Sequence, residues 1–227
     1  EKLEPAFTKA AKNALEKGRF SGKYGEILSF YDPGYHQASE IVLFGLGEAK
    51  NYKTACFRKA VSRMTKLAKG KKAASARLFL DTFLAGPVKS HDAAAIFEEA
   101  SRLTAYRFDK YIEKKGKEKE KEKELTLELL LSKGSEASLQ KKREEAKAVA
   151  EGVLLARDLI NEPGNIMNAP HLAEKARELA RQKKISCRIL GETELKRLKM
   201  GGILGVNQGS KTPPALIILE YGSRHKS

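Results

Sequence analysis

Residues 41–47 read Ile-Val-Leu-Phe-Gly-Leu-Gly, a short apolar run with β-branched members that is closed by two glycines. Such a run is typical of a strand that is buried on both faces. The residues that follow place apolar side chains at helical spacing up to Gly70, and Asn51 stands where it can cap this helix. The apolar side of the helix contains Ala55, Ala60, Val61, Met64 and Leu67. A strand followed by an amphipathic helix is the first indication of an α/β fold.

The rest of the first 135 residues continues this alternation. The patterns predict an amphipathic helix over 3–15, strands over 25–31, 76–80 and 125–131, and a further helix over 92–108. Strands that alternate with helices favour βαβ units. We therefore expect an α/β domain over 1–135 with a mainly parallel sheet covered by helices.

A long helix and a shorter second unit follow. Apolar residues recur at helical spacing over 136–160, in a segment that is charged at its start and apolar in its second half, which suits a connector between two domains. Pro163 ends this helix, because the residue before a proline avoids helical conformation. We then expect helices over 171–183 and 192–198 and strands over 186–190, 202–206 and 216–221. Residues 161–227 are too few to cover a sheet on both faces, so we interpret them as the truncated start of a larger α/β domain.

Two segments of this second unit carry further expectations. The glycine-rich run 201–210 (GGILGVNQGS) predicts close backbone approach or sharp bends, which would fit either the lining of an active site or close packing against a neighbouring element. The strand over 216–221 would leave an apolar edge exposed, so we expect either aggregation or a disordered C-terminal segment. Proteolysis is then expected to leave a stable core that ends near Lys133.

The chain is strongly basic. It has 44 Lys and Arg against 29 Asp and Glu, a formal net charge of +15, which favours a polyanionic or acidic partner. Residues 110–123 alternate Lys and Glu, a composition that is typical of a solvated surface extension, with nucleic-acid binding as the alternative. Aromatic residues make up 7% and tryptophan is absent, which argues against a stacking platform for single strands.

The sequence indicates a cytoplasmic protein. Its longest core-like apolar stretch, 215–219, is far too short to cross a membrane, and no signal segment opens the chain. The first residue is Glu1 and not Met, so we expect that the extreme N-terminus has been trimmed or not included. Cys56 and Cys187 lie far apart and form no CxxC pair, which is typical of two free thiols in a reducing compartment.

The residues do not predict a catalytic, cofactor-binding or metal-binding site. His36, His91, His171 and His225 form no zinc-binding pattern, and no G-x-S-x-G nucleophile turn is present. Gly45-Leu46-Gly47 resembles a phosphate-cradling turn, but Lys50 stands where the dinucleotide fingerprint needs its third glycine. We therefore assign no site residue of any of these three kinds.

Several segments together resemble the leucyl (cytosol) aminopeptidases. The resemblance is strongest at residues 156–170 (ARDLINEPGNIMNAP), 189–192, 195–210 and 213–221 (PPALIILEY), and looser at 22–28, 42–47 and 106–111 (YRFDKY). The form Asn165-Ile166-x-Asn168-Ala169 is similar to that of the bacterial, aminopeptidase A-like members. The resemblance covers nearly the whole chain.

This resemblance implies a two-domain subunit and a metal-dependent enzyme. The family has a macro-domain-like N-terminal domain, a mixed sheet between helices, which a long helix joins to a catalytic domain; subunits form hexamers. Its members remove N-terminal amino acids from peptides with two divalent ions (Zn, Mn or Mg), which lower the pKa of a bridging water and polarise the scissile carbonyl.

The family's metal-binding segments are absent from this sequence. Neither the Gly-Lys-Gly-x-x-Phe-Asp segment nor the Asn-Thr-Asp-Ala-Glu-Gly-Arg segment occurs in it. We therefore expect the chain alone to bind no metal and to be inactive, and to serve scaffolding and hexamer assembly in a full-length enzyme that acts on peptides. If the chain alone were active, the carboxylates to reconsider would be Asp158, Glu162 and Glu192.

Two other functions stay open at this stage. Some bacterial aminopeptidases that resemble this chain also bind DNA, and the net charge of +15 suits phosphate contacts. A macro-domain-like module would in turn suggest an ADP-ribose-type ligand, an idea that rests on fold analogy.

Overall fold

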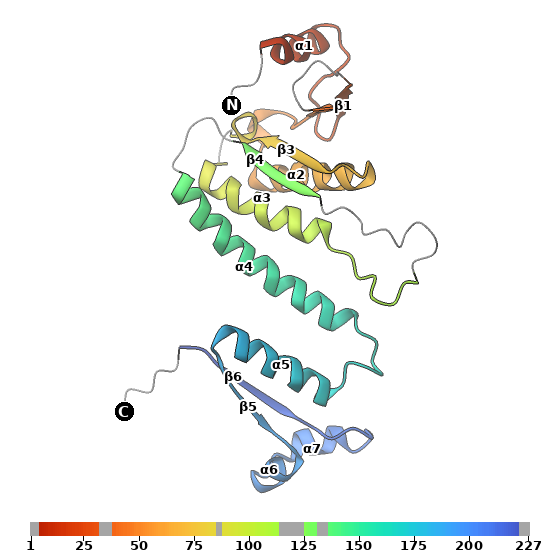
Figure 1. Cartoon of the computed structure of the whole chain (residues 1–227), viewed down its shortest axis with the longest axis vertical. Coiled ribbons are helices and arrows are strands. Elements are labelled where there is room, and N and C mark those ends of the chain that lie inside the picture. Colours follow the sequence, from red (N-terminus) through yellow and green to blue (C-terminus); the bar gives the residue numbers. More distant parts are fainter. Residues whose placement is uncertain (1–4, 32–37, 85–87, 114–124, 131–135, 223–227) are drawn as a thin grey trace. The chain divides into compact units, whose positions relative to one another are not determined.

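The computed structural model describes residues 5–31, 38–84, 88–113, 125–130 and 136–222 (Figure 1). The chain divides into two compact units, Glu1–Leu154 (unit 1) and Leu155–Ser227 (unit 2). The predicted extension at 110–123 and the predicted proteolytic end near Lys133 lie largely or wholly outside the described residues. None of the described helices is long and apolar enough to span a membrane.

Unit 1 alternates strands and helices, as predicted. Its elements are α1 (Pro5–Glu16), β1 (Ile27–Phe30), β2 (Ile41–Phe44), α2 (Thr54–Gly70), β3 (Ser75–Phe79), α3 (Ser90–Ala105), β4 (Thr126–Leu130) and the greater part of α4 (Glu136–Asn161), with short 3-10 turns η1 (Ala49–Asn51) and η2 (Leu80–Phe83). Strands β3 and β4 pair in parallel, and α2 and α3 pack against each other beside them (Figure 1).

The expectation of a mainly parallel sheet is wrong for β1 and β2. These strands pair antiparallel, with Ile27 opposite Phe44, and they form a two-stranded sheet of their own among the described residues. Only residues 31–40 join them, fewer than the dozen or so that a parallel crossover needs. The mixed sheet of a macro-domain-like fold stays a prediction.

Two local expectations around β2 and α2 are also wrong. All four residues of β2 are only partly buried, because this small sheet is not enclosed on both faces as a central parallel strand would be. Asn51 does not cap α2: it lies in η1, its amide Nδ2 donates to Glu48 Oε2 at 3.2 Å, and the helix begins after Lys53 without a side-chain cap. The predicted end of α2 at Gly70 is confirmed.

The core of unit 1 lies between α2, α3, η2 and the β3–β4 pair. The Phe57 ring is fully buried and meets Phe83 at a centroid distance of 5.5 Å. The hydroxyl of Tyr52 donates to the Phe83 carbonyl oxygen at 2.8 Å, so this buried polar group is satisfied, and burial raises the pKa of Tyr52 to about 12. The other buried members include Ala60, Val61, Met64, Leu78, Leu80, Val88, Ala93, Phe97 and Ala100.

An ion pair joins the start of β2 to the end of α2. Lys71 Nζ lies 2.7 Å from both carboxylate oxygens of Glu40 and donates to the Tyr31 hydroxyl at 2.9 Å. Burial alone would raise the pKa of Glu40, but the hydrogen bonds from Lys71 and Ser29 outweigh it, so the pKa of Glu40 lies below its ordinary value of 4.5.

This depressed pKa predicts a pH-dependent contribution to stability. The Glu40 contribution is fully present above the unfolded-state pKa and is lost as the pH falls through the lower folded-state pKa. Lys71→Met is therefore expected to destabilise unit 1 at pH 7, and the difference from the unsubstituted chain should shrink in acid. Urea titrations at pH 7 and near pH 3, followed by hydrogen exchange of the α2 amides so that unit 1 is read separately from unit 2, measure this. A difference that grows in acid would contradict the assignment.

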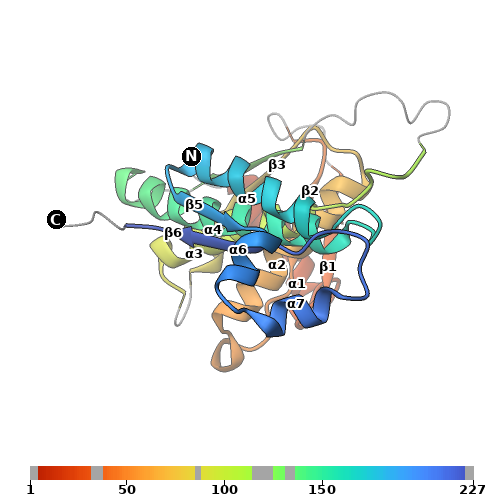
Figure 2. The ribbon, with the colours of Figure 1, turned by 90° about the horizontal axis from the view of Figure 1, so that it is seen from below.

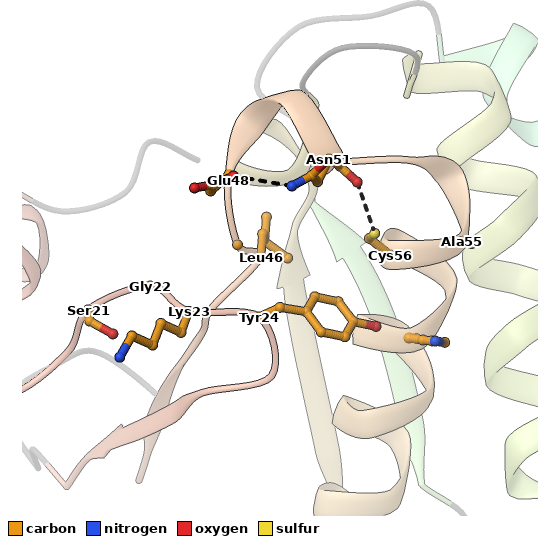
Figure 3. Close-up of a pocket in the computed structure, with 11 residues that line it drawn as sticks. Ser21, Gly22, Lys23, Tyr24, Leu46, Glu48, Asn51, Ala55 and Cys56 are labelled. Carbon is orange, nitrogen blue, oxygen red and sulfur yellow. Dashed lines mark hydrogen bonds between the residues drawn. The ribbon is translucent and has the colours of Figure 1, made fainter.

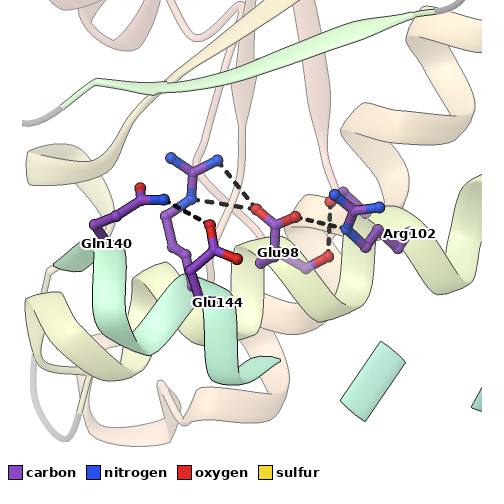
Figure 4. A network of polar contacts seen from close by, with 6 residues as sticks. Glu98, Arg102, Gln140 and Glu144 are labelled. Atoms are coloured by element: carbon purple, nitrogen blue, oxygen red, sulfur yellow. Dashed lines mark hydrogen bonds and ion pairs between the residues drawn. The ribbon is translucent and has the colours of Figure 1, made fainter. Parts of the chain in front are cut away.

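A second ionic network fixes the beginning of α4 on α3 (Figure 4). The Glu98 side chain, only 10% exposed, accepts from Arg102 Nε at 2.6 Å and from Arg143 Nη2 and Nε at 3.0 and 3.2 Å. Arg143 lies on α4, 45 residues along the chain from Glu98. Both Arg143 nitrogens donate to the same oxygen, Glu98 Oε2, and Arg102 donates to Oε1, so both carboxylate oxygens of Glu98 accept charge-assisted hydrogen bonds.

Removing the Arg143 guanidinium is expected to loosen the start of α4. Arg143→Met loses both hydrogen bonds to Glu98 and should cost about 1–3 kcal/mol. Hydrogen exchange should become faster in the first turns of α4. The matched control is Lys142→Met, which breaks only the exposed pair with Glu145 and should leave exchange unchanged. Equal effects of the two substitutions would contradict the role of Glu98.

Unit 2 contains α5 (Ala169–Lys183), β5 (Ser186–Leu190), α6 (Glu192–Arg197), α7 (Gly201–Asn207) and β6 (Leu216–Glu220). Strands β5 and β6 pair, α5 runs alongside them, and α6 and α7 lie across the strands from α5 (Figures 1 and 2). The small core contains Ala173, Ala176, Ala180, Leu190 and Leu195.

The predicted βαβ pattern of unit 2 is wrong. Residues 201–207 form helix α7 where a strand over 202–206 was expected, and β5 and β6 are antiparallel, with Leu190 opposite Leu216. In α7 Ile203, Leu204 and Asn207 are partly buried at helical spacing, whereas Val206 is 90% exposed. The two helices return the chain to the end of the sheet at which β5 stops, so β6 runs back along β5.

The glycines of this run do not mark close backbone approach. A Cβ added at Gly201, Gly202, Gly205 or Gly209 would meet no atom within 4 Å. The prediction of tight packing or a close backbone approach there is wrong for the described residues of this chain.

Candidate functional site

The described residues hold no ready-made metal centre. No group of three or more His, Cys, Asp or Glu side chains in the described part of the chain could bind an ion. Asp158 and Glu162 lie at the end of α4, and Glu192 opens α6, where its carboxylate pairs with Lys196 at 2.6 Å. These carboxylates form no such group. The residues that the structure describes therefore include no group that fits the two-ion centre implied by the family resemblance.

The histidine and cysteine side chains that the structure describes give no alternative metal centre. His171 stands in the first turn of α5, where its backbone N–H donates to Asn168 Oδ1 at 3.0 Å. His36 and His225 lie outside the described residues, as does the side chain of His91. Cys56 and Cys187 are free and partly buried, one in each unit.

The segment that carries the resemblance, 156–170, has a structural role here. It ends α4, turns, and starts α5. The Pro163 carbonyl accepts from the Ile166 and Met167 amides at 2.8 and 2.9 Å, and Asn168 then caps α5, with Pro170 in the first helical turn. Asparagine as the cap and proline just inside a helix start are typical of this position.

The Gly45-Leu46-Gly47 turn is explained by packing. The Gly45 amide donates to the Glu26 carbonyl at 2.8 Å and the Gly47 amide to the Gly22 carbonyl at 2.9 Å. A Cβ at Gly45 would lie 2.0 Å from the Lys23 carbonyl oxygen, and Gly47 adopts a φ of +77°. Because both amides bond within the protein, neither is available to a phosphate group, and close packing accounts for the two glycines.

The backbone amides of the neighbouring loop 21–23 are hydrogen-bonded within the protein as well. The carboxylate of Glu26 accepts from the Ser21 amide and hydroxyl and from the Lys23 amide, at 2.8–3.1 Å. These hydrogen bonds, first of all the one from the Ser21 side chain, lower the pKa of Glu26. An internal carboxylate thus fills the anion-binding position that loop 21–23 offers.

A pocket of about 680 Å³ opens beside these two loops (Figure 3). It lies between loop 21–24, the end of β2 and the first turns of α2, and its wall includes the Tyr24 ring and the Cys56 thiol. Its lining residues are Ser21, Gly22, Lys23, Tyr24, Leu46, Gly47, Glu48, Asn51, Ala55, Cys56 and Lys59. Sequence reasoning missed this pocket, since only its glycine turn gave a recognisable signal.

Two family models match the chain in the expected order. Residues 1–115 match the cytosol aminopeptidase family, N-terminal domain, and residues 154–227 match the cytosol aminopeptidase family, catalytic domain. The chain belongs to the cytosol aminopeptidase family. The predicted family resemblance is therefore confirmed.

Curated relatives of this family cover almost all of the chain. The probable cytosol aminopeptidase of Syntrophotalea carbinolica is 33% identical over 96% of this chain and 44% of its own length. The cytosol aminopeptidase of Pseudomonas aeruginosa is 34% identical over 93% of this chain and 42% of its own length. The chain thus spans less than half the length of these relatives.

Two solved structures have a similar architecture over this span. A mutant of tomato leucine aminopeptidase matches 94% of this chain and 41% of its own, with 25% identity and a TM-score of 0.77. The bottromycin maturation enzyme BotP in complex with Mn matches 91% of this chain and 41% of its own, with 25% identity and a TM-score of 0.73. The chain is thus a mixed helix and sheet protein that resembles leucine aminopeptidase.

Proposed function

We propose that this chain is the N-terminal portion of a cytoplasmic leucyl aminopeptidase that removes N-terminal amino acids from peptides. The observation that carries the proposal is the order of the matches: an N-terminal domain, then the beginning of a catalytic domain, in a chain that spans 41–44% of several relatives. The domain division that goes with it is 1–135 for the N-terminal domain, 136–160 for the connector helix and 161–227 for the start of the catalytic domain.

The chemistry of the full-length enzyme would come from two divalent ions, Mn or Zn, held by residues beyond this chain. Ions of this kind lower the pKa of bound water and polarise a carbonyl. The presence of Mn in the BotP complex supports a metal-dependent relative. The described residues of this chain have no group that fits these ions.

The role of this segment would be scaffolding and hexamer assembly. Unit 2 leaves large apolar side chains uncovered: Ile160 is 81% exposed, Val206 90% and Tyr221 88%. Exposed apolar surface of this kind is what a further part of a domain covers. A two-stranded sheet such as β5–β6 is also marginal on its own. Both observations support packing of additional catalytic-domain chain against unit 2.

Mixing the two portions tests the scaffolding role. This chain and the remaining portion of its parent enzyme would be produced separately and combined with Mn²⁺ and a leucine anilide. We expect a complex on size-exclusion chromatography, and hydrolysis by the mixture that neither portion shows alone. Full activity of the remaining portion by itself, or two portions that fold but do not associate, would contradict the proposal.

A further inference from the structure

Helix α4 carries an apolar stripe that no described element covers. Val149, Val153 and Ile160 are 60%, 37% and 81% exposed, and Ala156 is exposed as well. Successive members of this set are separated by four, three and four residues, so all of them lie along one side of the helix. We call these four residues the α4 seam.

The spacing of the α4 seam is that of a helix which packs along another helix. Alternating steps of four and three residues place every member in the contact row of a coiled-coil-like pair. The positions farthest round the helix from such a row are Glu151 and Asp158, both charged and exposed. Gly152 beside the row leaves open space, because an added Cβ would meet no atom within 4 Å. The helix is thus apolar on the side of the seam and charged on the far side.

The first half of α4 has a different surface. Its exposed positions over 140–145 are all charged or polar: Gln140, Lys141, Lys142, Glu144 and Glu145. Single exposed apolar residues are ordinary on a protein surface, whereas a contiguous apolar stripe marks an interaction surface. The change along one continuous helix therefore assigns its second half to contact with another element and not with water.

The family matches indicate what covers the α4 seam. The match to the catalytic domain begins at residue 154, within the seam, and the matched span is 44% and 42% of the length of two relatives. We propose that the α4 seam is the docking surface for an apolar helix of the remaining catalytic portion of the parent enzyme. This rests on the proposed function and adds to it a surface and the kind of element that covers it. Part of the same polypeptide is present at an effective concentration on the order of millimolar, which favours it over a second copy.

Cysteine labelling measures whether the seam is covered. Val149→Cys, Val153→Cys and Ile160→Cys would be made one at a time, both in the 227-residue chain and in the full-length parent. Maleimide labelling would be followed by peptide mass spectrometry, which separates each new cysteine from the natural ones. The matched control is Ala148→Cys, because Ala148 is exposed on the same helix but lies about 100° round it from Val149. Labelling in urea gives the intrinsic rate of each cysteine, and thermal melting checks that each variant folds.

We expect each seam cysteine to label about tenfold or more slowly in the parent than in the 227-residue chain, because labelling under a packed helix waits for local opening. The control Ala148→Cys should label at a similar rate in the two proteins. Hydrolysis of a leucine anilide by the same preparations of the parent tests the proposed function separately.

Three results would overturn the docking surface. Equal labelling of the seam cysteines in the chain and in an active parent would do so while leaving the proposed function intact. Slow labelling in the chain alone would mean that the seam is covered without the remaining portion. Protection in the parent that is lost when dilution separates its subunits would assign the seam to a second copy. An inactive parent would instead contradict the proposed function, and the labelling ratio would still decide whether the seam is covered.

Discussion

Phe57→Ala is expected to lower the free energy of unfolding of unit 1 by about 3–5 kcal/mol. The Phe57 side chain is fully buried in the first turns of α2, and its ring packs against Phe83 in η2. Its removal would leave a cavity between α2 and the η2 segment, which close-packed surroundings fill only in part.

Hydrogen exchange in α2 and α3 measures this effect, because a chain of two units is not described by one unfolding transition. The control is Val149→Ala on α4, since Val149 is 60% exposed. It should change stability by no more than about 0.5 kcal/mol. Similar exchange in the two variants would show that the core is not where we place it.

Leu195→Ala is expected to cost about 2–5 kcal/mol in unit 2. Leu195 on α6 is the one fully buried large side chain that the described part of unit 2 contains, and the rest of its small core is mostly alanine. The exchange of β5 and β6 amides should rise sharply, with unit 1 peptides as the internal reference. Val206→Ala, at a position that is 90% exposed on α7, is the matched control. A destabilisation as large in the control would contradict the assignment of Leu195 to the core.

Much of the secondary structure follows from periodicity in the sequence. The strand predicted over 186–190 is β5 without change, and the helix predicted over 136–160 is α4, one residue longer. These segments have a single clear period and a clear stop, such as Pro163 after α4. The strand prediction over 202–206 was wrong because a short apolar run broken by glycines fits a strand or a helix equally well, and these residues lie in helix α7.

Strand direction was harder to predict than strand position. The antiparallel pairing of β1 with β2 and of β5 with β6 depends on where the connecting segments return the chain. Hydrophobic patterns do not carry that information. The length of the 31–40 connection was the usable signal, and it excludes a parallel crossover between β1 and β2.

The pocket could not be predicted because its parts are remote in sequence and individually ordinary. Lys23 and Lys59 are two lysines among many in a chain of net charge +15. Gly45 and Gly47 drew attention as a phosphate turn, whereas the structure uses them for the close approach of loop 21–24. The family was recognisable only through the resemblance of whole residue runs such as 156–170 (ARDLINEPGNIMNAP) to its members, because a helix end, a turn and an asparagine cap are common to many folds.

Hydrolysis of a leucine anilide, with Mn²⁺ or Zn²⁺ added, tests the central claim most directly. The 227-residue chain and its full-length parent would be measured side by side at equal concentrations. We expect turnover by the parent and none by the chain, since under the proposed function the residues that hold the ions belong to the remaining portion of the enzyme. Turnover by the purified chain in proportion to its concentration would contradict this claim. Asp158, Glu162 and Glu192 would then be the first carboxylates to test as metal ligands.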